Sequence, residues 1–133
     1  MYKHILLPTD GSERSIRAIT AGIVLAKALN ARVTGLYTNE PTYIPGVDEG
    51  VTPRAEAALS IVTQLANEAG VTSACVSMLG VTPQDAIIQF AKEKACDLII
   101  MGTHGRSKVG KFFLGSVAAS VVADSEIPVL LYR

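Results

Sequence analysis

Three glycines frame a stretch of this chain whose residue types suit the binding of an anion. Gly102 and Gly105 follow an apolar run, and Gly115 with Ser116 opens a helix-forming run. Glycine lets a ligand approach the backbone closely, and the first turn of a helix offers unpaired N–H groups at the positive end of its dipole. The spacing of these residues therefore predicts a strand, a loop that binds phosphate or another anion, and then a helix.

Basic side chains lie within the same loop. Arg106, Lys108 and Lys111 add positive charge there, although each one alone is more simply explained as part of a solvated surface. His104 could contact a bound phosphate, but no nucleophile stands beside it, so the loop gives no support for catalysis. The loop is predicted to bind a ligand rather than to react with it.

Residues 105–111 also match the start of a P-loop, in which two glycines separated by four residues precede a lysine. The next residue of a P-loop is serine or threonine, which holds magnesium, whereas this chain has Phe112 there. The dinucleotide-binding pattern G-x-G-x-x-G also fails, because two residues separate Gly102 from Gly105. We interpret the P-loop match as coincidence.

Asp10 stands at the predicted end of the first strand and has several possible roles. Its carboxylate could bind a sugar hydroxyl or a magnesium ion, or it could simply cap the following helix. A phosphoacceptor role, as in receiver domains, would need a preceding acidic residue and a lysine near the last strand. Thr9 and residues 127–132 supply neither of these.

Apolar periodicity predicts the elements that position these residues. Strands are expected at residues 4–7, 31–38, 73–79, 97–101 and 127–132, and helices at 12–30, 53–70, 83–94 and 116–124. Pro8 is expected to end the first strand. Strands that alternate with helices imply right-handed crossovers and an open parallel sheet of five strands, covered by helices on both faces.

In such α/β sheets, ligands bind outside the carboxyl ends of the strands, near the point where the strand order reverses. Three segments are expected at that edge, namely residues 8–12, 38–40 and 102–116. The glycine loop and Asp10 are therefore predicted to lie close together.

Composition favours one domain over residues 1–133, large enough to fold without a metal or disulfide. The 12 basic and 12 acidic residues balance, which gives no support for a nucleic-acid-binding surface. Cys75 and Cys96 lie in apolar surroundings without CxxC spacing, so reduced thiols are expected, and only two histidines argue against a zinc site. The first apolar run is too short for a signal peptide or membrane span, so a cytoplasmic protein is expected.

Several motifs together resemble the universal stress protein family. They are the opening HILLPTDGSERS, DLIIMGTHG at 97–105, LGSVA at 114–118, the closing PVLLYR, and the glycine pattern G-x2-G-x9-G-S. The resemblance covers essentially the whole chain and implies a Rossmann-like fold with strand order 3-2-1-4-5. It also implies ATP binding, because family members with the complete glycine pattern bind ATP.

The resemblance further implies roles for individual residues. The backbone of Gly102, Gly105 and Gly115, the Ser116 hydroxyl and the Val117 N–H would hold the triphosphate, and Asp10 would bind the ribose. Thr38 would meet adenine through its backbone, while Pro8 and Thr9 would line the nucleoside pocket. The whole predicted nucleotide site is Pro8, Thr9, Asp10, Thr38, Met101, Gly102, His104, Gly105, Arg106, Gly115, Ser116 and Val117. The last strand would pair with a second copy of the chain through Ile127, Val129, Leu130, Leu131 and Tyr132.

Three functional hypotheses follow. The first is an ATP-binding, homodimeric stress-response protein that is regulated by nucleotide without rapid turnover, with ADP, AMP or a cyclic nucleotide as alternative ligands. The second is a slow ATP hydrolase, in which Asp10 holds Mg²⁺ and His104 or Lys111 touches the γ-phosphate. The third is a dimeric interaction module that binds no nucleotide, against which the intact glycine pattern argues.

Overall fold

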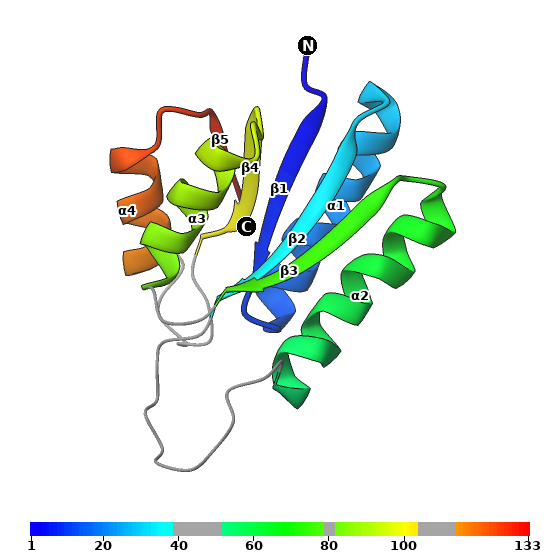
Figure 1. Ribbon diagram of the computed structural model, residues 1–133, viewed down its shortest axis with the longest axis horizontal. Helices are drawn as coiled ribbons and strands as arrows, with labels where there is room; N and C mark the ends of the chain where they lie inside the picture. Colours follow the sequence, from blue (N-terminus) through cyan, green and yellow to red (C-terminus); the bar gives the residue numbers. More distant parts are fainter. Residues whose placement is uncertain (39–51, 79–81, 104–113) are drawn as a thin grey trace.

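A computed structural model describes residues 1–38, 52–78, 82–103 and 114–133 (Figure 1). Strands and helices alternate along the chain in the order β1 (His4–Thr9), α1 (Glu13–Leu29), β2 (Arg32–Thr38), α2 (Pro53–Ala69), β3 (Ser73–Met78), α3 (Pro83–Glu93), β4 (Leu98–Gly102), α4 (Ser116–Asp124) and β5 (Val129–Tyr132). No helix within these described ranges has the length and apolar character needed to cross a membrane.

The strands form one parallel sheet in the order β3-β2-β1-β4-β5. Helices α1 and α2 cover one face, and α3 and α4 cover the other (Figure 1). Alternate residues of β1 supply both cores: Ile5 and Leu7 pack with α1 and α2, whereas Leu6 packs with α3 and α4. The predicted α/β class, its five parallel strands and the order 3-2-1-4-5 are confirmed.

The helix ends follow from local side-chain chemistry. The Ser12 hydroxyl accepts a hydrogen bond from the backbone N–H of Ser15 at the start of α1, and α2 begins in the same way at Thr52, one residue before Pro53. Both helices end at a residue in the left-handed conformation, Asn30 for α1 and Gly70 for α2. These boundaries agree with those expected from the sequence.

The prediction that Pro8 ends the first strand was wrong, because β1 continues through Pro8 to Thr9. The C=O of Lys3 accepts from Arg32 of β2, and the C=O of His4 accepts from Asp97, the residue before β4, so the backbone groups of successive residues face alternate neighbours. By this alternation Pro8 faces β4, and its missing N–H interrupts only that ladder. Pairing with β2 is unaffected and runs on to Thr9 opposite Tyr37.

Other predicted ends also shift by one or two residues. The Asp97 carboxylate accepts hydrogen bonds from the backbone N–H groups of Lys3 and His4, so β4 begins only at Leu98. The Ile127 N–H is bound by the Ser125 hydroxyl, and β5 begins at Val129. Helix α3 ends at Glu93 instead of Lys94, and the hydroxyl of Thr82, the residue before the helix, donates to the Asp85 carboxylate instead of capping the backbone.

Gly22 of α1 lets that helix lie directly against the sheet. A Cβ at this position would stand 2.5 Å from a methyl carbon of Leu7 in β1 and 3.5 Å from one of Ile100 in β4. Because α1 approaches so closely, one helix contacts both central strands at the same level.

A small polar cluster is buried at the amino ends of the strands. His4 is only 5% exposed, its Nε2 lies 2.7 Å from the Thr34 hydroxyl oxygen, and its Nδ1 lies 3.6 Å from Cys96 Sγ. Burial and the nearby positive charge of Arg32 lower the pKa of His4 below its ordinary value. Burial also raises the pKa of Cys96 to about 11, so this free thiol stays protonated, as expected for a packing residue.

The lowered pKa of His4 makes a prediction about stability. The unfolded chain takes up a proton at the ordinary histidine value of 6.5, and the folded chain takes it up only at lower pH. Stability contributed by neutral His4 is thus complete above about pH 6.5 and is lost as pH falls below it. Urea denaturation between about pH 5 and 8 should show this loss in the wild type and a flatter profile in His4→Gln. Parallel profiles would contradict the assignment, since His104 is present in both proteins.

Candidate functional site

The carboxyl ends of β1, β2 and β4 and the start of α4 lie at one edge of the sheet (Figure 1). This edge holds nine of the residues predicted from the sequence to form the site: Pro8, Thr9, Asp10, Thr38, Met101, Gly102, Gly115, Ser116 and Val117. His104, Gly105 and Arg106 lie outside the described residues, as do Lys108 and Lys111.

The two central strands separate as they approach this edge. β1 and β4 pair only at Ile5 with Leu98 and at Leu6 with Ile99, although both strands continue to Thr9 and Gly102. The strand order reverses here, because β2 and β3 lie to one side of β1 while β4 and β5 lie to the other. Pro8 provides a local cause, since its backbone cannot donate toward β4. Open α/β proteins bind ligands outside the strand ends at such a reversal, and we call this expected binding position, between Thr9 of β1 and Gly102 of β4, the crevice.

Asp10 lies in the short turn that joins β1 to α1. Its Oδ1 accepts a hydrogen bond of 2.9 Å from the Ser12 N–H, and Gly11 adopts a φ of +81° that other residues resist. The carboxylate is half-buried and sits where β1 reaches the crevice. The turn therefore orients a negative group, and a hydrogen-bond acceptor, at the edge where the ligand is expected.

The two ends of the glycine loop are joined by a backbone hydrogen bond. The Gly115 N–H donates to the Thr103 carbonyl over 2.7 Å. Gly115 is the N-cap of α4, and within the described residues no side chain caps this helix, in contrast to α1 and α2. Among the described residues, the first-turn N–H groups of α4, those of Ser116 and Val117 among them, thus have no side-chain acceptor, and an anion suits that position.

The sequence analysis missed a pair of buried hydroxyls beneath Asp10. Thr9 was expected to line the nucleoside pocket, but it is 5% exposed and its Oγ1 lies 3.0 Å from Ser15 Oγ. The signal available in the sequence was the spacing of Ser12 and Ser15, since residues three apart lie on one side of a helix.

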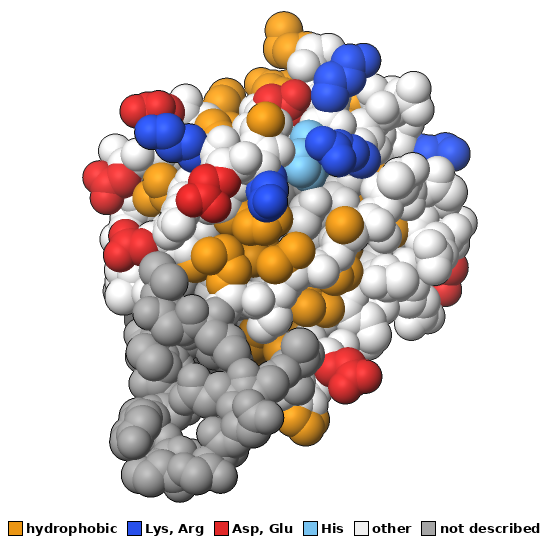
Figure 2. Space-filling view, in the orientation of Figure 1, with side chains coloured by type: hydrophobic (Ala, Val, Ile, Leu, Met, Phe, Trp, Pro, Cys, Tyr) orange, Lys and Arg blue, Asp and Glu red, His pale blue; other side chains and the backbone are white. Residues whose placement is uncertain are grey.

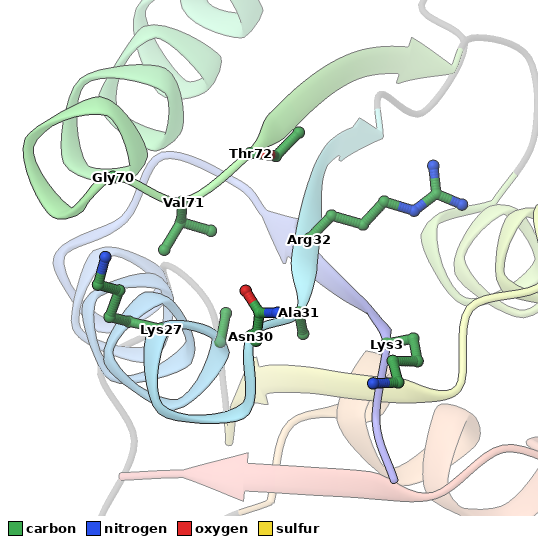
Figure 3. A pocket seen from close by; sticks show the side chains of 9 residues that line it. Lys3, Lys27, Asn30, Ala31, Arg32, Gly70, Val71 and Thr72 are labelled. Atoms are coloured by element: carbon green, nitrogen blue, oxygen red, sulfur yellow. The ribbon is translucent and has the colours of Figure 1, made fainter.

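A separate hollow of about 320 Å³ lies at the opposite, amino edge of the sheet (Figure 3). Lys3, Lys27 and Arg32 line it, and Lys and Arg side chains also gather at this edge in Figure 2. The Lys27 ammonium nitrogen lies 3.3 Å from where a Cβ on Gly70 would stand, beside the carbonyl end of α2, which a positive charge stabilises. The hollow includes no residue of the predicted site.

Metal ligands do not cluster in the described ranges: no group of three or more His, Cys, Asp or Glu residues could hold an ion there. Asp10 therefore belongs to no such group within the described residues. Mg²⁺ at this edge would depend on the oxygen atoms of a bound ligand for most of its coordination.

The fold, with its reversal of strand order at β1, defines a doubly wound α/β protein. The model of the universal stress protein family matches residues 1–133, so the chain belongs to the universal stress protein family.

Curated relatives support this assignment over the whole chain. A universal stress protein of Thermus aquaticus is 37% identical, and the match covers 100% of both chains. Universal stress protein MJ0531 of Methanocaldococcus jannaschii is 34% identical over 100% of this chain and 83% of the relative.

Solved structures of the family share the fold. The structure of the M. jannaschii protein MJ0577 has a TM-score of 0.85 and 28% identity, and the match covers 98% of this chain and 95% of that one. A universal stress protein in complex with cAMP has a TM-score of 0.81 and 27% identity, over 99% of this chain and 97% of that one.

Proposed function

We propose that this protein binds an adenine nucleotide, ATP foremost, in the crevice between β1 and β4, and that it acts in the stress response through nucleotide-dependent regulation. The observation that carries the proposal is the joining of the loop ends at Thr103 and Gly115, next to a start of α4 that no side chain of the described residues caps. A phosphate group at that point would accept hydrogen bonds from the first-turn N–H groups and would favour the positive end of the helix dipole. The cAMP complex of the similar universal stress protein supports an adenine nucleotide as the ligand class.

We assign each part of the nucleotide to residues at this edge. The phosphates would lie on the backbone of Gly102, Gly105 and Gly115, with the Ser116 hydroxyl and the Val117 N–H. Asp10, held at the end of β1, would accept hydrogen bonds from the ribose hydroxyls. Pro8 and Met101 would border the nucleoside from β1 and β4, Thr38 would reach adenine from the end of β2, and His104 and Arg106 would add contacts to the phosphates.

Regulation rather than rapid turnover is the better fit to the described part of the site. Asp10 accepts a hydrogen bond from the Ser12 N–H, and no cluster of metal ligands within the described residues includes it. Binding and release of nucleotide would then be the signal. Mg²⁺ would accompany the phosphates, with Asp10 as its nearest protein ligand. The free thiols of Cys75 and Cys96 suit a cytoplasmic protein.

Titration calorimetry of the purified protein with ATP, ADP, AMP and cAMP, each with and without Mg²⁺, tests this proposal. We expect saturable binding of one nucleotide per chain, with ATP among the ligands. Mass spectrometry of any small molecule that accompanies the protein through purification would identify the cellular ligand. Absence of binding at about 1 mM of every nucleotide would refute the proposal.

A homodimer through β5 is the second part of the proposal. β5 is the edge strand next to β4, and it alternates between half-buried and exposed residues. Val129 and Leu131 pack into the core, whereas Leu130 and Tyr132 are 38% and 40% exposed. Antiparallel pairing of this edge with a second copy would cover both side chains and satisfy the open backbone groups.

A further inference from the structure

The turn that carries Asp10 is closed by a continuous chain of hydrogen bonds. The Gly11 N–H donates to Thr9 Oγ1 over 3.1 Å, and Thr9 Oγ1 lies 3.0 Å from Ser15 Oγ. Ser15 Oγ donates in turn to the Ser12 carbonyl over 2.9 Å. This series of hydrogen bonds therefore begins and ends at backbone groups of the turn, the Gly11 N–H and the Ser12 C=O. The two hydroxyls between them belong to Thr9 of β1 and Ser15 of α1.

The direction of every bond in this chain is determined. A carbonyl oxygen can only accept, so the single proton of Ser15 Oγ is given to Ser12. Ser15 must then accept from Thr9, and Thr9 must accept from Gly11. Each hydroxyl donates once and accepts once, and bonds arranged in one direction reinforce one another.

The Thr9 and Ser15 side chains are almost inaccessible to solvent, at 5% and 7% exposed. Removal of either hydroxyl would leave a buried partner without its bond, and water could not easily replace it. The turn would then lose its link to β1, to α1, or to both. Asp10 lies between Thr9 and Gly11, which this series of hydrogen bonds holds together. Its carboxylate also accepts a hydrogen bond from the Ser12 N–H of the same turn.

We propose that Thr9 and Ser15 are positioning residues that hold the Asp10 carboxylate in its ribose-binding orientation. This inference rests on the proposed function, and it changes the expected role of Thr9. The only proton of the Thr9 hydroxyl is directed to Ser15, away from the ligand, so Thr9 acts on the nucleoside through Asp10.

Sugar selectivity distinguishes positioning from a general contribution to folding. If Asp10 binds the ribose hydroxyls, the wild type should bind ATP more tightly than 2′-deoxy-ATP or 3′-deoxy-ATP. Ser15→Ala should raise the Kd for ATP about tenfold, the effect of losing one well-placed hydrogen bond, and bring the deoxy-to-ribo ratio of Kd values close to one. Loss of stability alone would weaken all three ligands alike and leave that ratio unchanged.

Matched variants make the measurement specific. Thr20→Ala removes an exposed hydroxyl of the same helix, which donates to the Ile16 carbonyl, and should keep the wild-type ratio. Thr9→Val should reproduce the loss of selectivity, whereas Thr9→Ser, which keeps the hydroxyl, should retain selectivity. The comparison of Thr9→Val with Thr9→Ser tests the positioning role even if Ser15→Ala does not fold.

The outcomes separate this inference from the proposed function. A wild type that binds none of the three nucleotides refutes both. A wild type that discriminates among the sugars, together with Ser15→Ala and Thr9→Val variants that discriminate equally well, refutes the positioning role alone. A wild type that binds all three equally also refutes it, because Asp10 then has no ribose contact to position.

Discussion

Replacement of Gly115 by leucine is expected to abolish nucleotide binding while the fold remains intact. Gly115 has φ −59° and ψ 153°, angles that any residue adopts, so its conformation does not require glycine. In our proposal, glycine is required because a phosphate lies against the backbone at the start of α4, where a larger side chain would occupy the same space. Calorimetric titration should show a Kd for ATP raised about 100-fold or beyond detection.

The melting temperature and a matched variant decide how that result is interpreted. An apolar residue at the N-cap costs about 1 kcal/mol or less relative to glycine, so Gly115→Leu should unfold only slightly earlier. Ala119→Leu places the same side chain on an exposed position of the same helix and should bind ATP normally. Unchanged affinity in Gly115→Leu would show that the phosphates lie elsewhere.

Replacement of Leu130 by glutamate is expected to convert the protein from a dimer to a monomer. In the proposed dimer Leu130 would be covered by the second copy, and burial of an unpaired carboxylate there would cost far more than the leucine contact contributes. Light scattering coupled to size-exclusion chromatography should give a mass near 14.0 kDa for the variant and about twice that for the wild type.

The other edge of the sheet provides the control for this second experiment. Ala74 is an exposed residue of β3, the opposite edge strand, and Ala74→Glu should remain dimeric. A wild type that elutes as a monomer, or a Leu130→Glu variant that stays dimeric, would contradict pairing through β5.

Much of the fold could be predicted because local signals agree with tertiary packing. The bounds of α4, residues 116–124, and the ends of α1 and α2 follow from caps and apolar periodicity that the core also uses. Pro8 was misjudged because a proline's effect on a strand depends on which neighbour its backbone faces. Which neighbour Pro8 faces depends on the strand order of the assembled sheet, so the residues near Pro8 do not predict it.

The site could be predicted in outline but not in detail. The sequence placed Asp10, Thr38 and the glycine pattern at one edge, because carboxyl ends of parallel strands must share an edge. It could not show that the Thr9 hydroxyl turns toward Ser15, since side-chain direction depends on the packing of α1 against β1. The roles of His104, Gly105 and Arg106 remain predictions, because these residues lie outside the described part of the chain.

The close approach of α1 to the sheet has a mechanical consequence for the crevice. Gly22 lies against Leu7 and Ile100, which are the first residues beyond the short ladder that joins β1 to β4. At that level β1 and β4 no longer pair with each other. Helix α1 packs behind both strands there and holds them in place relative to each other. By leaving space for this contact, Gly22 determines how closely α1 packs behind β1 and β4, next to the edge where the nucleotide is proposed to bind.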